Sequence, residues 1–509
     1  MYAAADGGWY GGGRGAGGAV AAGLYRDGPP GCRQLQRRAG LRGLHQGPLD
    51  LFLNTLARHG SYLDEELTVH LRDDAPIDLR YDAIQRVKNG LVGAGSRSAT
   101  RQLAARRPTV QGCEEIDEAT YTTVMPQATV EDKGLLRVLL AAGVWTGKFL
   151  YAAGQLESPR CPFCGAAVED LEHMWFDCPH NQDLREGKPL FLPEVRSHLP
   201  ACLRNYGIAP ACGPRPGQAL WPADEGAMTN QAARVLLAAM PEGYVATAID
   251  SYIAECGGGI ASARHLASHL RDGPHLQAPV VSRVFEPAPA AINSYSDGSV
   301  QLPGLFGRGG SGAWWPCRSG RPSQAETNFA HVLEEARGLA LAAALRTPLL
   351  SSTRTEILGV AMAMLHEGGV HVGVDNWPAI RNIRQLLRVK AADREAFYAK
   401  VKNGDLLRLV ANIESQRGPG SVVLTKVKAH TDAAEAAAGA ISATHRAGND
   451  KADRVAKAAA DMQEQPGTLA LKALHQRHQV LIGIVRSFQQ LMFFHHEEAV
   501  QPRGSQDHP

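Results

Sequence analysis

The stretch Ile292-Asn-Ser-Tyr-Ser-Asp-Gly-Ser299 alternates like a short β-strand and then reaches an acid and a glycine. Such alternation predicts a strand, and Gly298 would allow the chain to turn sharply. An aspartate at the end of a strand, facing a concave surface, is a usual starting point for a metal-dependent phosphoryl-transfer site. Asp-Gly is also an ordinary turn dipeptide, so this stretch by itself leaves both interpretations open.

Three more acids follow, each at the end of a predicted strand or the start of a predicted helix. Glu356 comes after the capping residues Ser351 and Ser352 and opens an apolar helical pattern. Asp375 ends an alternating run that begins at Val370 and predicts another strand. Asp453 lies in the first turns of a predicted helix. Each acid by itself is a weak signal, and their order along the chain is the informative feature.

Five motifs run in order: Tyr-Ser-Asp-Gly-Ser at 295–299, Thr-Glu-Ile-Leu at 355–358, Val-Asp-Asn at 374–376, Val-Lys-Ala-His at 427–430 and Gly-Asn-Asp-Lys-Ala-Asp at 448–453. Together they resemble a type 1 ribonuclease H domain, and the match covers about 290–462, roughly a third of the chain. The resemblance implies that Asp297, Glu356, Asp375 and Asp453 are catalytic and bind two Mg²⁺ ions. It also implies that His430 assists proton transfer or product release.

Simple electrostatics explains why such acids need metal ions. Two carboxylates about 4 Å apart repel by about 4 kcal/mol at an effective dielectric near 20, so four in one cleft need cations to neutralise them. Two magnesium ions supply that charge and clamp the attacking and leaving oxygens of a phosphodiester. The alternative is that all four are surface acids on a fold that has lost its activity.

The predicted fold of this part is α/β, a mixed five-stranded sheet with flanking helices. Strands are predicted near 291–297, 309–316, 327–336, 370–375 and 421–428, and helices near 353–366, 378–388, 393–414 and 447–462. Three features depart from the family pattern. The connection from Gly320 to Ser352 is long, and Lys426 stands where many members have Trp. In addition, 22 residues with an Ala-rich insert separate His430 from Asp453, which argues against a fixed position for His430.

A second strong signal is the spacing C-x2-C-x8-H-x4-C formed by Cys161, Cys164, His173 and Cys178. A Cys-x-x-Cys knuckle followed by His and Cys on one helical face can close a tetrahedral Cys3His site, so we expect one structural Zn²⁺. His180 is an alternative ligand, and four unligated residues are the alternative interpretation. The segment also resembles the zinc-binding segment that follows the reverse transcriptase of LINE-type (non-LTR) retrotransposons.

Composition restricts the remaining possibilities. The formal net charge is only +2 over 509 residues, so nucleic-acid contacts must come from local patches such as Arg381 to Lys402, with seven basic residues against two acids. A solvated helix face is the alternative for that run. No apolar run is long enough to predict a membrane span. Nine scattered cysteines do not suggest a disulfide framework, which favours an intracellular, reducing compartment, the nucleus or cytoplasm.

The sequence predicts the following organisation: a disordered Gly/Ala/Arg-rich tail at 1–47, a helical region of unknown role at 48–129, a zinc-binding helical module at 130–200, a linker or helical region at 201–289, the ribonuclease H-like domain at 290–462, and an amphipathic helix with a disordered tail at 463–509. His265 and His269 have the i, i+4 spacing of a metal pair, but without an adjacent acid motif a solvated helix face is favoured. Protein partners are not indicated.

These signals lead to one functional hypothesis and one rival. The hypothesis is an endonuclease that hydrolyses the RNA strand of RNA–DNA hybrids with two metal ions, derived from a retroelement polyprotein without its polymerase. The rival is a non-catalytic nucleic-acid-binding protein that kept the fold and the zinc segment. The intact acids favour the enzyme, whereas the altered histidine loop favours the binder.

Overall fold

The structure is a computed structural model, and it describes residues 48–124, 130–141, 143–215, 219–221, 231–239, 244–255, 260, 262–273, 275–302, 304–318, 320–335, 338–428, 442–462 and 465–500. The predicted disordered tail at 1–47, the residues from 501 onward and also His430 lie outside these residues. The chain divides into two compact units, one of 1–72 with 76–80 and one of 73–75 with 81–509.

The first unit contains a short helix and a small sheet. Helix α3 (Pro48–Arg58) is followed by β1 (Tyr62–Leu63), β2 (Thr68–His70) and β3 (Ile77–Asp78), which form an antiparallel sheet in that order. Leu53 and Leu56 are buried on one side of α3, and Val69 and Ile77 are buried in the sheet. This alternation of buried and exposed positions is what an amphipathic helix and a one-sided sheet require.

The first part of the second unit is helical. Its helices are α4 (Ile84–Arg106), η1 (Pro108–Val110), α5 (Glu118–Val124), α6 (Val130–Leu140), α7 (Gly147–Ala152), η3 (His173–Asp177), η4 (Pro179–Asn181), α8 (Gln182–Arg185), η5 (Pro189–Phe191), α9 (Pro193–Ser197), α10 (Ala201–Tyr206), α11 (Gln231–Ala238), α12 (Tyr244–Glu255) and α13 (Ala263–Arg271). They share one hydrophobic core with the last helix, α21 (Gln465–Val500). Its predicted apolar stripe, including Leu474, Leu481 and Phe488, is buried there.

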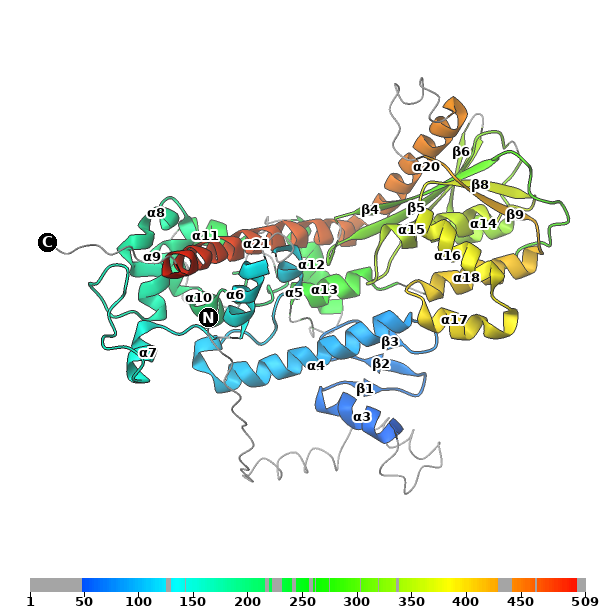
Figure 1. Ribbon diagram of the computed structural model, residues 1–509. Helices are drawn as coiled ribbons and strands as arrows, with labels where there is room; N and C mark the ends of the chain where they lie inside the picture. The colour runs from blue at the N-terminus through cyan, green and yellow to red at the C-terminus, as the bar shows by residue number, and fades with distance from the viewer. Residues whose placement is uncertain are drawn as a thin grey trace. The chain divides into compact units, whose positions relative to one another are not determined.

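The second part of this unit is built on a mixed sheet (Figure 1). Its strands are β4 (Ser294–Gln301), β5 (Arg308–Trp315), β6 (His331–Glu335), β7 (Gly338–Leu345), β8 (Val370–Val374) and β9 (Val422–Lys426). The order is β6-β7-β5-β4-β8-β9. Strands β4 to β7 pair antiparallel, whereas β8 pairs parallel with both β4 and β9.

The prediction of five strands is wrong by one. The third predicted strand, near 327–336, contains β6, but its first residues belong to helix α14 (Gln324–Phe329), which starts with a capping box formed by Ser323 and Glu326. The strand that was not predicted is β7, which pairs with both β5 and β6 and leaves β6 at the edge of the sheet. These elements account for the long connection between Gly320 and Ser352.

Helices cover both faces of the sheet. On one face lie α15 (Ser352–Ala363), α16 (Trp377–Arg388) and α18 (Gly404–Arg417), which share a core with the strands; α17 (Arg394–Lys400) follows α16 after the short turn η6 (Ala391–Asp393). Helix α20 (Ala443–Asp461) lies on the other face over β4, β5 and β7 (Figure 1). No helix in the described ranges is both long and apolar enough to cross a membrane.

Glycines in β5 determine how closely α20 approaches the sheet. A Cβ at Gly310 would lie 2.2 Å from the carbonyl oxygen of Ala456, and one at Gly312 would lie 2.6 Å from that of Ala452. The helix therefore rests directly on the strand, with alanines facing it. This close approach carries the polar side chains of α20 to the middle of β4, where Asp297 lies.

Candidate functional site

Two of the predicted acids are brought together by parallel strand pairing. Ser296 of β4 pairs with Val374 of β8, so Asp297 and Asp375 are the next residues on two neighbouring strands. Side chains at matching positions of adjacent strands point to the same face. Asp297 is 5% exposed, and its Oδ1 accepts a hydrogen bond from the amide of Gly298.

Glu356 reaches the same place from the second turn of α15. Ser351 caps that helix by accepting a hydrogen bond from the amide of Arg354. The helix lies so close to β4 that a Cβ at Gly298 would lie 2.3 Å from Oγ1 of Thr355. Gly298 is therefore required for close packing of helix on strand, rather than for a turn as the sequence suggested.

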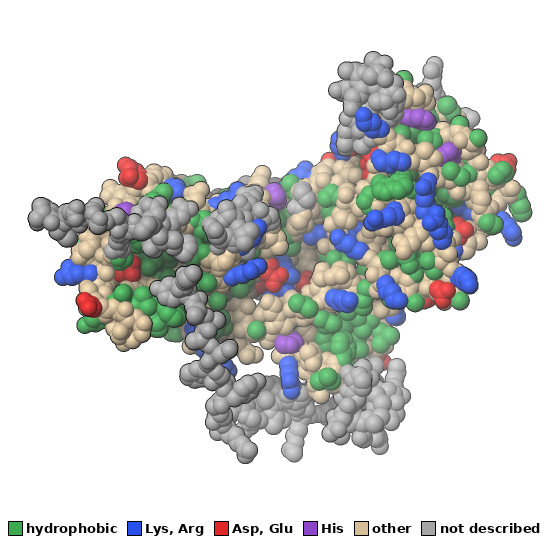
Figure 2. All heavy atoms as spheres, viewed as in Figure 1, with side chains coloured by type: hydrophobic (Ala, Val, Ile, Leu, Met, Phe, Trp, Pro, Cys, Tyr) green, Lys and Arg blue, Asp and Glu red, His purple; other side chains and the backbone are tan. Residues whose placement is uncertain are grey.

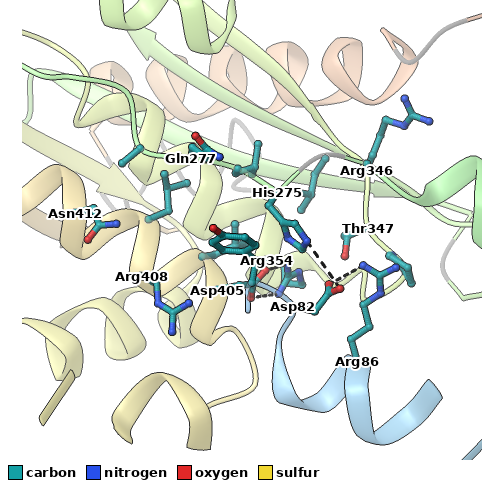
Figure 3. A pocket seen from close by; sticks show the side chains of 18 of the residues that line it. Asp82, Arg86, His275, Gln277, Arg346, Thr347, Arg354, Asp405, Arg408 and Asn412 are labelled. Carbon is teal, nitrogen blue, oxygen red and sulfur yellow. Dashed lines mark hydrogen bonds and ion pairs between the residues drawn. The ribbon is translucent and has the colours of Figure 1, made fainter. Parts of the chain in front are cut away.

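An ion pair on the wall of a nearby pocket holds the start of α15. Arg354 donates to both carboxylate oxygens of Asp405 on α18, at 2.8 and 2.5 Å, and Figure 3 shows the two side chains facing each other. The pocket has a volume of about 530 Å³. Arg86, another residue of its wall, forms ion pairs with both Asp82 and Asp272. We assign this pocket a structural role in fixing α15.

The three acids form one group, in which Asp297 and Glu356 are buried and Asp375 is partly exposed. Oxygens of Asp297, Glu356 and Asp375 lie within 4.8 Å of one another. Burial, and then the charge of Asp375, raise the pKa of Asp297 to about 7. Burial and the charges of Asp297 and Asp375 raise the pKa of Glu356 well above its usual range. Its Oε2 is buried without a hydrogen-bond partner in the described part of the chain. The group is therefore an oxygen-lined, under-neutralised site that fits divalent cations.

Asp453, the fourth predicted acid, lies at the edge of this group. Its charge contributes to the raised pKa of Asp297, but its carboxylate is not among the oxygens within 4.8 Å. Instead it accepts a bond of 2.6 Å from Lys457, one turn further along α20. His430, the fifth predicted residue, lies outside the described residues.

Asn449 belongs to the site, although the sequence analysis did not select it. Its amide nitrogen lies 3.4 Å from Oδ2 of Asp375, and its Oδ1 is buried without a partner among the described residues. It precedes Asp453 by four residues, so both lie on the same edge of α20. That spacing within the motif Gly-Asn-Asp-Lys-Ala-Asp was the signal that could have identified it.

The four predicted zinc ligands also come together. Sγ of Cys161 lies 3.8 Å from Sγ of Cys178, and Sγ of Cys164 lies 3.3 Å from Nε2 of His173. All four ligand atoms lie within 4.8 Å of one another. His173 is the first residue of η3, a one-turn π-helix. At its end the amide of Cys178 donates a hydrogen bond to the carbonyl oxygen of His173. A Cys3His group of this kind could hold zinc.

The pKa values of the three thiols are shifted in ways that a bound cation would change. Burial raises the pKa of Cys161 to about 12 and also raises that of Cys178. Burial by itself would raise the pKa of Cys164, but hydrogen bonds from backbone amides and from Cys161 outweigh this effect and lower the pKa to about 7. His180, the alternative ligand, lies outside this group and its ring stacks on Phe163 at 5.1 Å. The geometry thus favours the first of the two predicted ligand sets.

The prediction of a solvated face for His265 and His269 is wrong. His265 is 5% exposed, and its Nε2 lies 3.0 Å from that of His269. Burial, and then the charge of His269, lower the pKa of His265 to about 4. Among the described residues, no third ligand completes a metal group there. We interpret the two rings as a neutral, hydrogen-bonded pair in the wall of the helical core.

Basic side chains lie on the helices that follow Asp375 in the chain. Figure 2 shows Lys and Arg spread over the face that carries α16, α17 and α18. Arg381, Arg388 and Lys390 are exposed there. Trp377, two residues after Asp375, is 51% exposed, and the guanidinium of Arg384 lies 5.8 Å from the centre of its ring. This surface combines the positive charge and exposed aromatic area that nucleic-acid backbones and bases contact.

Comparison with known proteins gives little further guidance. No protein-family model matches the chain, and no curated protein matches it. Among solved structures, the chain is similar to LC9-RNase H1, described as a type 1 RNase H with the type 2 active-site motif, at 15% identity over 37% of this chain and 78% of that chain. The TM-score is 0.22, so this likeness carries no weight below.

Proposed function

We propose that this chain is a nuclease that hydrolyses the RNA strand of RNA–DNA hybrids and that it derives from a LINE-type retroelement. The observation that carries the proposal is the group of three close carboxylates, Asp297, Glu356 and Asp375, of which the first two are buried. Burying acids side by side is costly, and function is the usual reason that a fold retains such strain.

Two Mg²⁺ ions held by these acids, with Asp453 as a fourth ligand, would supply the charge that stabilises the attacking and leaving oxygens of the phosphodiester. The residues of the chain fix the geometry. Strand pairing sets the distance between Asp297 and Asp375, and the capped start of α15 places Glu356 between them. Asn449 orients Asp375 through its amide.

The basic surface of α16 and α17 would hold the nucleic acid. Exposed Arg381, Arg388 and Lys390 contribute affinity for the phosphate backbone without reading sequence. Selection of a hybrid would follow the 2′-hydroxyls of the RNA strand, which a protein contacts across the minor groove. A zinc-bound Cys3His group would stabilise the segment from Cys161 to Cys178.

The rival function is nucleic-acid binding without cleavage. It is favoured by one observation, the ion pair of Asp453 with Lys457, because an acid already neutralised by lysine is less available to a metal ion. Under this alternative the basic surface keeps its role and the acids do not act.

A cleavage assay distinguishes the two functions. Wild-type protein should cut a labelled RNA–DNA hybrid with Mg²⁺ and stop when chelator is added. Asp297→Asn should remove nearly all cleavage and leave hybrid binding intact, because it removes a metal ligand rather than a backbone contact. Asp450→Asn, an exposed acid in the same motif, is the matched control and should cut normally. Wild-type protein that binds hybrid but never cuts it with Mg²⁺ or Mn²⁺ establishes the rival.

A further inference from the structure

The pocket beside the start of α15 has charged walls whose acids are already neutralised. Four arginines and three aspartates line its volume of about 530 Å³. Arg86 forms ion pairs with Asp82 and Asp272, at 2.6 and 2.8 Å, and Arg354 donates to both oxygens of Asp405. Two of the four arginines therefore account for all three aspartates, and the other two remain as surplus positive charge.

The two remaining arginines are Arg346 and Arg408, and Figure 3 shows them on opposite sides of the pocket. Arg346 is exposed, forms no ion pair within the described ranges, and places Nη2 3.5 Å from the carbonyl oxygen of Leu270. Arg408 pairs with Glu395, whose side chain is 75% exposed and does not line the pocket. Because such an exposed pair contributes little, both guanidiniums can bind anionic groups at two separate ends of a ligand.

The lining between these arginines is apolar and includes an aromatic surface. Leu345, Leu406 and Leu409 line the pocket and are almost fully buried. Tyr81 is 48% exposed, and the centre of its ring lies 5.4 Å from that of His275, with 43° between the ring planes. Nucleobases stack on exposed aromatic rings, and the leucines offer further apolar contact. The pocket therefore suits a planar, largely apolar group that carries an anion on each side.

Two side-chain amides add polar contacts to the pocket. Gln277 and Asn412 are exposed there and form no side-chain hydrogen bond in the described part of the chain. An amide both donates and accepts hydrogen bonds, so each can bond the edge of an unpaired base. The volume lies in the range of about 300–1,000 Å³ that holds a small molecule. A base pair offers no free edge and brings a second nucleotide, so the pocket favours a single strand.

We propose that this pocket binds one unpaired nucleotide of a nucleic-acid strand, with the base against Tyr81 and His275 and the flanking phosphates against Arg346 and Arg408. The phosphates before and after a nucleotide lie on opposite sides of its sugar, which matches two separated arginines. A free nucleoside monophosphate has a phosphate at one end only. The inference rests on the nucleic-acid partner of the proposed function and adds a single-strand contact outside the acid group. It requires neither metal ions nor cleavage.

Binding of a labelled single-stranded oligonucleotide, measured in chelator, tests the site without cleavage. Tyr81→Ala should weaken binding about five- to hundredfold, the loss expected for one stacked base, whereas Tyr81→Phe keeps the ring and should bind normally. Arg346→Ala and Arg408→Ala should each reduce the salt slope of log K by about 0.7, the value for one phosphate contact on a single strand. Arg204→Ala, on α10 and outside the pocket, is the control and should change neither quantity.

Three other ligands identify what enters the pocket. An abasic oligonucleotide should bind wild-type protein and Tyr81→Ala equally, because it has no base to stack. A fully paired duplex should also bind both proteins equally, because none of its bases is free. A nucleoside monophosphate should compete only weakly with the oligonucleotide, since it carries one of the two phosphates.

Three outcomes overturn the inference. They are single-strand binding by Tyr81→Ala at wild-type strength, an equal loss for single strand and duplex, and a monophosphate that competes as strongly as the oligonucleotide. If Tyr81→Ala does not fold, as judged by thermal unfolding, His275→Ala removes the second ring and takes its place. Any of these outcomes in a protein that cuts hybrid normally refutes the pocket alone. Failure of the wild-type protein to cut hybrid refutes the proposed cleavage and leaves the binding result standing.

Discussion

The acid group and the Cys/His group are both suited to metal ions, but they are assembled in opposite ways. The thiols and imidazole come from one short segment, between Cys161 and Cys178, and a tight knuckle and a π-turn bring them together. The three acids come from two strands and a helix that are far apart in sequence. A local site needs only its own turns, whereas a distributed site needs the whole sheet.

Without a cation both groups favour the protonated form, but the causes differ in weight. Burial is the main cause of the raised pKa values of the Cys161 and Cys178 thiols. For Asp297 and Glu356, the charges of neighbouring carboxylates add to burial in raising the pKa values. The comparison suggests that the Cys/His group gains stability from metal, whereas the acid group gives up stability for function.

The largest expected effect comes from neutralising Glu356. Glu356→Gln should reduce hybrid cleavage at least about 10³-fold and also stabilise the metal-free protein by about 1–3 kcal/mol, because the amide is neutral without the proton that Glu356 must take up on burial. Cleavage rates and denaturant unfolding in chelator measure the two effects. If the variant loses both activity and stability, the acids are not a strained group and the comparison fails.

In the Cys/His group, by contrast, removing a ligand should lower both metal binding and stability. Cys161→Ser should lower the zinc content of protein purified without chelator from about one equivalent to near zero and lower its thermal unfolding temperature. His180→Ala should keep the zinc, since His180 lies outside the group. Unchanged zinc in Cys161→Ser would show that the ligands are misassigned, and Asp297→Asn should leave zinc content unaffected.

The raised pKa of Asp297 predicts a pH dependence of stability. Between its ordinary pKa near 4 and its folded value of about 7, the native protein binds more protons than the unfolded chain, so stability should fall as pH rises through this range. The shift corresponds to about 4 kcal/mol at most. Denaturant unfolding in chelator from pH 4.5 to 8 measures it. Asp297→Asn should flatten the profile, and an identical slope in both proteins would contradict the assignment.

The smallest effect is expected from the basic surface. Arg381→Ala should weaken hybrid binding several-fold and reduce the salt slope of log K by about 1, because it removes one phosphate contact. It should leave kcat unchanged at saturating substrate. Filter binding at several salt concentrations checks both numbers. Arg204→Ala, a basic residue on α10 in the helical part, is a control that should change neither.

The sequence predicted the local features well and the long-range ones unevenly. The zinc spacing, the strand at Asp297 and the apolar helix after Glu356 were all recognised, because each signal lies within a few residues. The sixth strand, β7, was missed because its sequence, Gly-Leu-Ala-Leu-Ala-Ala-Ala-Leu, is rich in alanine, a residue depleted in strands. The burial of His265 was missed because a histidine on an amphipathic helix gives no indication of what packs against it.

What the sequence by itself determined is the chemistry available to this protein: which side chains exist, and which of them a single turn or strand brings into register. Only the tertiary structure decided which of them meet. Parallel pairing of β4 with β8 set Asp297 beside Asp375, the glycines of β5 let α20 approach, and that approach placed Asn449 at the acids while leaving Asp453 with Lys457. Such contacts depend on how elements distant in sequence pack, and no short-range sequence pattern encodes how closely those elements approach one another.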